Sequence, residues 1–365
     1  MRIVHVIASL GVGGAETLLA QIVRRQADDG HEVHVVSLLG IQKITMPRAV
    51  KVHFLSAECA RPKSLGLVLA LTRKLIVLQG DVVHAHMLHS NLLTRLVRPW
   101  CRIPMLVNTV HSIYETSNFL YRMGYRYLDR VADVTVFVSN EVMGQYVKER
   151  LTSSQRSAVV HNGIDTSEFV FDDEARARIR EEFGLESDAI VIVAIGRLTE
   201  YKDYPNLLAA FEQLSAACPN TRLLIVGDGK LRTLIEQMVK DKGLGPRVVF
   251  TGIRKDMPAI ISAGDMLVLA SAYEGFGLVL AEAMSCGVPV ATTDCGGTAE
   301  VIGDCGRLVP VRNPEALAAA MQDLIQLPSA TRKELIAAGR ERVRNKFSID
   351  ATVKSWYGIY EGIRS

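Results

Sequence analysis

Two glutamates, Glu274 and Glu282, lie eight positions apart in the stretch SAYEGFGLVLAEAMSCGVPV, which begins at Ser271. The pattern predicts a strand ending near Ala272, a glycine loop, and a helix from about Leu278 to Gly287. The first amides of a helix have no intrahelical partner, so such a loop can bind hydroxyl-rich or anionic ligands. Because Glu282 falls about one turn inside the helix, both carboxylates can face one site. A carboxylate there suits the two hydroxyls of a nucleotide's ribose.

Two cations, Arg197 and Lys202, stand in the stretch AIGRLTEYKDYPNLL. The apolar run from Ala189 to Ile195 predicts a strand that ends just before them, and Pro205 suits the first turn of the following helix. A cation about 4 Å from a phosphate charge is worth about 4 kcal/mol at an effective dielectric constant of about 20. The pair is therefore predicted to hold a diphosphate leaving group. The alternatives are surface charges here, and a capping and a solvated carboxylate at the two glutamates.

A glycine-rich turn, IASLGVGGAETLLA, follows the first apolar run. It matches a dinucleotide fingerprint incompletely, because Glu16 stands where the third glycine belongs. The next strand, HEVHVVSLL, also ends without the acidic residue that binds a ribose in dehydrogenases. A dehydrogenase is therefore not expected. Gly13 and Gly14 either allow a ligand close to the backbone or form a tight strand-to-helix turn.

Composition excludes several classes of protein. The chain has 365 residues, a formal net charge of +3 and a pI near 8.5, which is too mild for a nucleic-acid binder. The six cysteines form no C-x-x-C pair, so neither a zinc site nor a disulfide framework is expected. No stretch approaches the roughly 18 apolar residues of a membrane-spanning helix. The sequence predicts a cytoplasmic protein, at most peripheral on the inner face of the cell membrane.

The chain as a whole predicts two α/β domains. Seven short apolar runs alternate with helical patterns before the stretch HNGID, and six more follow it. We expect one doubly wound domain over residues 1–164, a second over residues 165–347, and a last helix in residues 348–365 that crosses back to the first domain. Ligands of open α/β sheets bind at the carboxyl ends of the strands, so both sheets should face a shared central cleft.

These motifs together resemble those of the retaining family-four glycosyltransferases of GT-B fold, also called glycosyl transferases group 1. The resemblance rests on the E-x7-E spacing of Glu274 and Glu282, the GRL…K pattern of Arg197 and Lys202, the NGID hinge and the N-terminal GVGGAE. It runs from Met1 to about Lys346. It implies two Rossmann-like domains, with a nucleotide-sugar donor bound mainly by the C-terminal one and the acceptor mainly by the N-terminal one.

The resemblance also implies roles for individual residues. Arg197 and Lys202 would hold the diphosphate, Glu282 the ribose, and Glu274 the sugar hydroxyls. His111, at the end of an N-domain strand, would reach the donor sugar near its anomeric carbon; the alternative is a packing histidine. The remaining donor contacts are expected from backbone at Gly275, Phe276, Gly277, Leu278, Gly13, Gly14, Gly227, Gly252 and Ile253.

The expected reaction is sugar transfer with retention at the anomeric carbon. In that family the departing phosphate oxygen helps to deprotonate the acceptor hydroxyl. No Asp-x-Asp motif occurs in the chain, so the cations would replace a metal, and no metal or other cofactor is expected. We expect a UDP-sugar and a saccharide or lipid-linked acceptor in bacterial surface polysaccharide or glycolipid assembly. A GDP-sugar (mannosyl) transferase, a UDP-sugar epimerase and a silent sugar-nucleotide-binding subunit are the alternatives.

One basic, aromatic segment raises the question of a membrane partner. Arg122, Arg126 and Arg130 recur at helical spacing close to Tyr121 and Tyr125. Just upstream lie Arg95, Arg98 and Arg102. Such a face could meet an anionic membrane surface that carries a lipid-linked acceptor. The alternative is a solvated face with ordinary aromatic packing.

Overall fold

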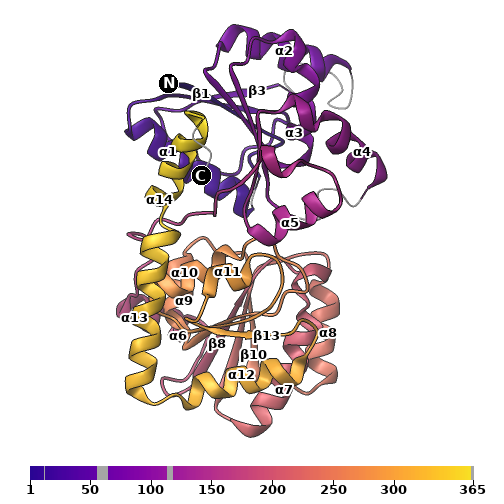
Figure 1. Cartoon of the computed structure of the whole chain (residues 1–365). Coiled ribbons are helices and arrows are strands. Elements are labelled where there is room, and N and C mark those ends of the chain that lie inside the picture. Colours follow the sequence, from indigo (N-terminus) through magenta and orange to yellow (C-terminus); the bar gives the residue numbers. More distant parts are fainter. Residues whose placement is uncertain (12, 56–64, 113–117, 363–365) are drawn as a thin grey trace. The chain divides into compact units, whose positions relative to one another are not determined.

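The computed structural model describes residues 1–11, 13–55, 65–112 and 118–362. The described chain divides into two compact units, each built around its own sheet (Figure 1). Unit 1 comprises residues 1–163 together with residues 349–365, and unit 2 comprises residues 164–348. The last helix therefore belongs to the same unit as the first strand.

Unit 1 contains a seven-stranded sheet in the order β3-β2-β1-β4-β5-β6-β7, and every pairing in it is parallel. The seven apolar runs of the sequence all form strands. Their bounds are β1 Arg2–Ile7, β2 Glu32–Ser37, β3 Lys51–Phe54, β4 Val82–His86, β5 Met105–Val110, β6 Val134–Phe137 and β7 Ser157–Val159. The chain order reverses between β1 and β4, so this point is the topological switch of the sheet.

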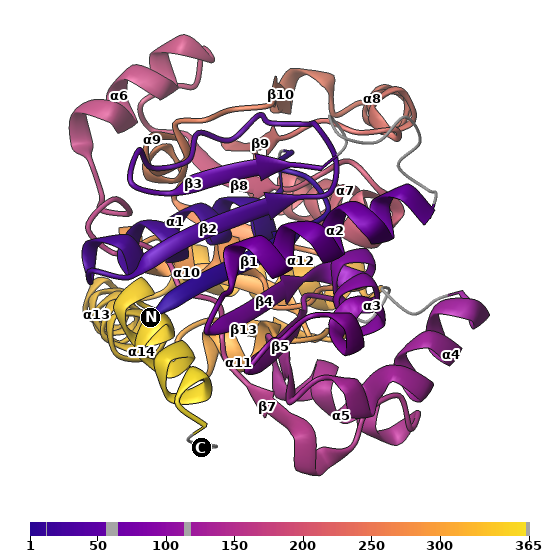
Figure 2. The ribbon, with the colours of Figure 1, turned by 90° about the horizontal axis from the view of Figure 1, so that it is seen from above.

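The helices of unit 1 cover the two faces of this sheet, as parallel sheets require. Their bounds are α1 Gly14–Asp28, α2 Leu65–Leu78, α3 Met87–Val97, α4 Phe119–Leu128, α5 Asn140–Lys148 and α14 Ile349–Tyr360. Figure 2 shows α14 alongside α1, and these two helices are in contact. Trp356 and Tyr360 of α14 are buried in one hydrophobic cluster with Ile3, Leu18 and Ile22. The apolar face of this helix is thus part of the core of unit 1.

Unit 2 contains a six-stranded parallel sheet in the order β10-β9-β8-β11-β12-β13. Its strands are β8 Ile190–Ile195, β9 Thr221–Val226, β10 Val248–Gly252, β11 Met266–Leu269, β12 Val290–Thr293 and β13 Arg307–Val309. Its helices are α6 Asp173–Glu182, α7 Tyr204–Ala217, α8 Arg232–Asp241, α9 Met257–Ala263, α10 Leu278–Cys286, α11 Thr298–Ile302, α12 Pro314–Gln326 and α13 Ser329–Lys346. The topological switch lies between β8 and β11. The predicted architecture of two doubly wound parallel sheets is confirmed.

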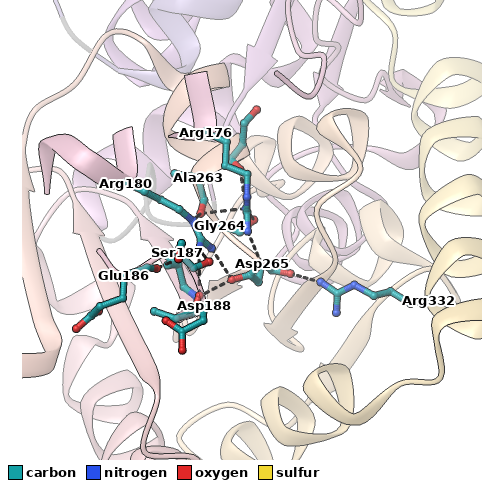
Figure 3. A network of polar contacts seen from close by, with 12 residues as sticks. Arg176, Arg180, Glu186, Ser187, Asp188, Ala263, Gly264, Asp265 and Arg332 are labelled. Carbon is teal, nitrogen blue, oxygen red and sulfur yellow. Dashed lines mark hydrogen bonds and ion pairs between the residues drawn. The ribbon is translucent and has the colours of Figure 1, made fainter. Parts of the chain in front are cut away.

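A charged network joins α6 to the start of β11 in unit 2 (Figure 3). The carboxylate of Asp265 accepts a hydrogen bond from Arg176 at 2.7 Å and another from Arg180 at 2.7 Å. The same carboxylate accepts the backbone N–H of Val191, at the start of β8, at 2.7 Å. The backbone oxygen of Asp265 accepts from Arg332 of α13 at 2.6 Å. One aspartate therefore ties two helices to the two central strands.

The predicted basic face is wrong in its geometry. Helix α4 ends at Leu128, so Arg130 lies in a 3-10 turn over Asp129–Val131 and does not continue the helix. Arg122 forms an ion pair with Glu149 at 2.5 Å. Upstream, Arg95 is fully buried and donates to Asn108 at 2.6 Å. These side chains satisfy groups of the fold, because a buried guanidinium needs acceptors.

Across the described ranges, no helix combines the length and apolar character needed to cross a bilayer.

Candidate active site

The strongest candidate site lies at the topological switch of unit 2. Ligands of open α/β sheets bind there because the loops after the two central strands diverge and leave a crevice. Glycines let these loops approach one another closely: a Cβ on Gly227 would lie 2.2 Å from the carbonyl oxygen of Gly196. Gly227 also has a φ of 130° and donates its N–H to the carbonyl of Gly252 at 2.8 Å. The ends of β8, β9 and β10 are thereby held as one surface.

Lys202 and Glu274 meet at this switch. Lys202 ends a short 3-10 helix, Glu200–Lys202, after β8, and its aliphatic stem lies over Gly196, with Cε 3.1 Å from where a Cβ would be. Its ammonium contacts the carboxylate of Glu274, which follows β11. The two side chains are 21% and 18% exposed, so the ion pair is largely shielded but open on one side. A cation and a carboxylate are therefore both available to one ligand.

Backbone hydrogen bonds bring the two loops together. The carbonyl of Tyr201 accepts the N–H of Ala272 at 2.9 Å and that of Tyr273 at 3.3 Å. Ser271 also donates to the Glu274 carboxylate at 3.3 Å. On the other side, Gly296 packs directly against the Glu274 carbonyl, because its φ of 57° and lack of a side chain permit this approach. The position of Glu274 is thus fixed from two sides.

The loop after Glu274 begins helix α10 as the sequence predicted. Gly277 is its N-cap, with a φ of 90°, and Leu278 is its first residue. Phe276, however, turns its side chain into the core, where its ring meets that of Phe347 at 5.5 Å. Only the backbone of Phe276 can serve a ligand. The first-turn amides of α10 therefore lie directly after the Glu274 carboxylate.

Glu282 lies one turn inside α10, and its surroundings differ from those of Glu274. Burial and the nearby charge of Glu168 raise the pKa of Glu282 to about 7. Burial thus favours the protonated carboxyl group, which both donates and accepts hydrogen bonds. Among the described residues, the side chain of Glu274 contacts Lys202 and Ser271 rather than Glu282.

The remaining predicted residues of unit 2 lie at the same edge of its sheet. Arg197 directly follows Gly196 and is exposed. Gly252 ends β10 with a φ of 71°, and Ile253 after it is 65% exposed. Arg197 and Lys202 thus follow β8, Glu274 follows β11 and Gly252 ends β10, so all four lie at the carboxyl edge of one sheet.

The glycine turn of unit 1 begins α1. Gly13 is the N-cap and Gly14 the first helical residue, both after β1. A Cβ on Gly13 would lie 2.5 Å from a carboxylate oxygen of Glu16, so the helix's first acidic side chain folds back over this turn. A carboxylate in that place repels a phosphate and accepts hydrogen bonds from hydroxyls.

A cluster of buried imidazoles occupies the switch of unit 1. His5 of β1 is paired in register with His84 of β4, and His86 ends β4. The ring centroids of His84 and His86 are 4.0 Å apart, and the ring centroid of His111 lies 5.9 Å from that of His86. Burial lowers the pKa of His5 and of His111 to about 4 and that of His84 and His86 well below 6.5. All four imidazoles are therefore neutral at pH 7.

These pKa values predict that unit 1 loses stability in acid. A histidine whose pKa is lower in the folded than in the unfolded state stabilises the fold fully above pH 6.5, and this contribution is lost as the pH falls toward 4. For His5 alone the free energy of unfolding should fall by about 3 kcal/mol between pH 7 and pH 4. Hydrogen exchange of the β1 and β4 amides measures it. His5→Gln should make the free energy of unfolding depend less on pH, whereas His89→Gln, at an exposed position, should leave that dependence unchanged. Equal protection of the wild-type amides from exchange at pH 4 and at pH 7 would contradict the expectation.

Some residues at these sites were missed at the sequence level. Tyr201 acts through its backbone carbonyl, and Gly296 acts through the absence of a side chain. Both contacts join segments far apart in the chain, so no local pattern signals them. Gln26 likewise hydrogen-bonds His5 at 2.8 Å from the last turn of α1, where it looks like an ordinary helical polar residue.

Comparison with family models accounts for most of the chain. Residues 175–342 match the model described as glycosyl transferases group 1, and residues 12–168 match glycosyltransferase family 4. The first match lies within unit 2, and the second covers unit 1 from residue 12 and ends five residues into unit 2.

Curated relatives and solved structures agree with these matches. One relative is a GDP-mannose-dependent alpha-(1-6)-phosphatidylinositol monomannoside mannosyltransferase of Mycolicibacterium smegmatis. The two sequences are 34% identical over a stretch that covers 57% of this chain and 56% of that protein. The N-acetyl-alpha-D-glucosaminyl L-malate synthase of Bacillus anthracis is 26% identical over 96% of this chain and 94% of its own. The structure of Anabaena Alr3699/HepE in complex with UDP and glucose superposes with a TM-score of 0.84, at 21% identity and 99% coverage of both chains.

Proposed function

The chain belongs to the group 1 glycosyl transferases of GT-B fold, and from this premise we propose that it transfers a sugar from a nucleotide-diphosphate sugar to a saccharide or lipid-linked acceptor, with retention of the anomeric configuration. The observation that carries the proposal is the Lys202–Glu274 pair at the switch of unit 2. One side chain can neutralise a diphosphate while the other accepts hydrogen bonds from the hydroxyls of the sugar attached to it.

The mechanism follows from these charges. As the bond between the anomeric carbon and the diphosphate breaks, negative charge grows on the leaving oxygen, and a fixed cation there lowers the barrier. Lys202 and Arg197 supply that charge, so the reaction proceeds without a divalent metal. The departing oxygen takes the proton of the acceptor hydroxyl on the same face of the sugar, which produces retention. Glu282 receives the ribose hydroxyls, and when protonated its carboxyl group can both donate to and accept from them.

We expect a uridine nucleotide as donor. The HepE structure is a complex with UDP and glucose, whereas the mycobacterial mannosyltransferase is GDP-mannose-dependent by name. In a thermal-shift panel of UDP, GDP, ADP and their sugars, UDP-sugars should raise the melting temperature most, because a ligand at about 100 times its Kd adds about 2.7 kcal/mol to the free energy of unfolding. If GDP-mannose raised the melting temperature more than the UDP-sugars did, the donor would be a guanosine nucleotide instead.

Product analysis separates transfer from the alternatives. The best donor is incubated with mono- and disaccharide acceptors, with and without EDTA, and the product is examined by NMR. A new glycoside with the anomeric configuration of the donor, formed equally with EDTA, is expected. An epimerised nucleotide sugar without acceptor would favour an epimerase, and no turnover of any bound donor would favour a silent binding subunit. An inverted product would reject retention.

The acceptor is proposed to be presented at an anionic membrane. Helix α2 exposes Leu65, Leu69, Ile76 and Val77, of which Val77 is 76% exposed. Helix α2 contacts α3, and the turn after α3 exposes Trp100. From position 65 to position 128 the acidic residues are Asp81 and Glu115, whereas the exposed basic side chains are Arg73, Arg102 and Arg126. An apolar face bordered by positive charge fits the boundary of anionic lipids.

Sedimentation with vesicles tests this surface. The protein should pellet with phosphatidylglycerol-containing vesicles and not with pure phosphatidylcholine. Val77→Glu should lower the bound fraction about tenfold, because it replaces apolar area that the bilayer would bury with a charge that anionic lipids repel. Leu234→Glu, at a 54% exposed position on α8 of unit 2, is the matched control and should bind as wild type. Equal pelleting of all three proteins would exclude α2 as the contact.

A further inference from the structure

The buried imidazoles of unit 1 form one continuous hydrogen-bonded network with Gln26 and Tyr360. The Gln26 side chain lies at its centre, with Oε1 2.8 Å from Nε2 of His5 and Nε2 3.4 Å from the hydroxyl of Tyr360. One arm continues from Nδ1 of His5 to Nε2 of His86 at 2.9 Å. The other arm runs from Tyr360 to Nδ1 of His84 at 2.7 Å. It ends with Nε2 of His84 against the Thr109 hydroxyl at 2.6 Å.

The direction of every bond in this network follows from the Gln26 amide. Its oxygen can only accept, so Nε2 of His5 carries a proton. A neutral imidazole has one proton, so Nδ1 of His5 is an acceptor and Nε2 of His86 must donate to it. On the other arm the Gln26 N–H donates to the Tyr360 oxygen. Among the described residues, Nδ1 of His84 is the acceptor within reach of the Tyr360 O–H, so this hydroxyl donates to His84. The network thus predicts the Nε2–H tautomer for all three histidines.

The rings are neutral because they are buried, which lowers the pKa of each of them far below the physiological range. Hydrogen bonds within the network also occupy both nitrogens of His5, both of His84 and Nε2 of His86. The three histidines lie close enough to be considered as metal ligands, but an ion would have to break several of these bonds. A hydrogen-bonded network, unlike a metal site, keeps the polar groups of these side chains satisfied.

One ring nitrogen remains. Nδ1 of His86 has no hydrogen-bond partner among the residues that the structure describes, although the side chain is only 2% exposed. His86 is the last residue of β4 and the N-cap of α3, so it stands at the carboxyl edge of the sheet and at its switch point. This is where an open α/β sheet binds its ligand. Because Nε2 carries the proton, Nδ1 has a free lone pair that can accept a hydrogen bond.

We propose that the Gln26 amide fixes the tautomer of His5, His84 and His86, and that His86 thereby presents its Nδ1 as a hydrogen-bond acceptor to a hydroxyl of a bound saccharide at the switch of unit 1. The ligand half of this inference rests on the proposed function, since it takes the saccharide to be a substrate of the transfer. Gln26 is a positioning residue, because it acts on the saccharide only through His5 and His86.

The tautomers are measured directly in the wild-type protein. In the full chain labelled with ¹⁵N-histidine, long-range proton–nitrogen spectra distinguish protonated from bare ring nitrogens. All three histidines should be protonated at Nε2. If the Gln26 amide had the opposite orientation, every bond would reverse and all three would be protonated at Nδ1. Such a result, or a mixture of tautomers at His86, would overturn the proposal without any measurement of transfer.

Two variants separate the arms. Gln26→Leu removes the common centre, so His86 should lose its single tautomer, whereas Tyr360→Phe breaks only the His84 arm and should leave His86 protonated at Nε2. Melting curves establish that both fold. A general packing defect would affect His86 alike in both variants, and that outcome would contradict the assigned role of Gln26.

The ligand is tested by titration. Glucose, galactose, mannose and N-acetylglucosamine are added in turn to the labelled protein with UDP or GDP, and the Nδ1 resonance of His86 is followed. The saccharide that binds should move this resonance toward the range of protonated nitrogens. Its Kd should rise about two- to tenfold in Gln26→Leu, the worth of one neutral hydrogen bond, and stay unchanged in Tyr360→Phe. A His86 resonance that no saccharide moves would overturn the ligand half while leaving the measured tautomers intact.

Discussion

Lys202→Ala should lower kcat/KM for the nucleotide sugar at least a hundredfold. Its ammonium stands at the switch of unit 2 against Glu274, and at about 4 Å a cation is worth about 4 kcal/mol to a phosphate charge at an effective dielectric constant of about 20. Even half of that energy, realised only as the leaving oxygen gains charge, changes the rate by more than tenfold, and the loss also leaves Glu274 unneutralised beside the diphosphate. Glu274→Ala should cost a similar factor, because the sugar then loses its carboxylate acceptor.

The control for this prediction is another lysine in a comparable ion pair. Lys242 contacts Glu212, a residue of α7, at 2.5 Å, and its side chain is 27% exposed. It is the C-cap of α8 and does not belong to the loops that follow β8 and β11. Lys242→Ala should therefore turn over as wild type. Initial rates for the three variants and circular dichroism of each provide the measurement. Near-wild-type turnover by Lys202→Ala would reject the site.

Asp265→Ala should lower the free energy of unfolding of unit 2 by about 3–5 kcal/mol. Removing one partner of a largely buried ion pair leaves the other charge without compensation, and here Arg176 and Arg180 both lose their carboxylate. Arg180 is only 7% exposed and burial already lowers its pKa, so without Asp265 its charge is left with neutral acceptors such as the carbonyl of Ala263. The amide of Val191 loses its acceptor as well.

Native-state hydrogen exchange assigns this effect to its unit. Protection should fall in β8 and β11 and stay unchanged in β1 and β4, because the network is confined to unit 2. Asp323→Ala is the comparison: Asp323 pairs with Arg307 but is 54% exposed, and an exposed pair contributes at most about 1 kcal/mol. If Asp323→Ala cost as much as Asp265→Ala, burial would not be the source of the stability.

The candidate site of unit 2 could be predicted because its residues are encoded locally. Lys202 and Glu274 each follow an apolar run that can only be a strand, and parallel strands bring their carboxyl ends to one edge. The pattern also predicted that α10 begins at Leu278. It could not show that Phe276 turns into the core toward Phe347, because that contact depends on a residue far along the chain.

The features that the sequence did not disclose depend on register and on distant partners. His84 and His86 look like unremarkable strand residues until β1 brings His5 beside them and α14 adds Tyr360. The prediction for the basic segment around Arg122 was wrong for the same reason, because regular spacing alone indicated a shared helix face. In the structure, partners on other elements determine where the side chains point: Glu149 pairs with Arg122, and Asn108 accepts from Arg95. Charge spacing alone does not separate a binding surface from internal pairing.

The route of the chain through the two units has a consequence for biosynthesis. Unit 1 includes α14, whose Trp356, Ile359 and Tyr360 complete the cluster around Ile3 and Ile22. A ribosome must therefore translate all of residues 164–348 after the seventh strand before this apolar flank of the first sheet can be covered. Unit 2 can fold while it emerges, whereas unit 1 waits with exposed apolar surface, which is the condition under which nascent chains engage chaperones.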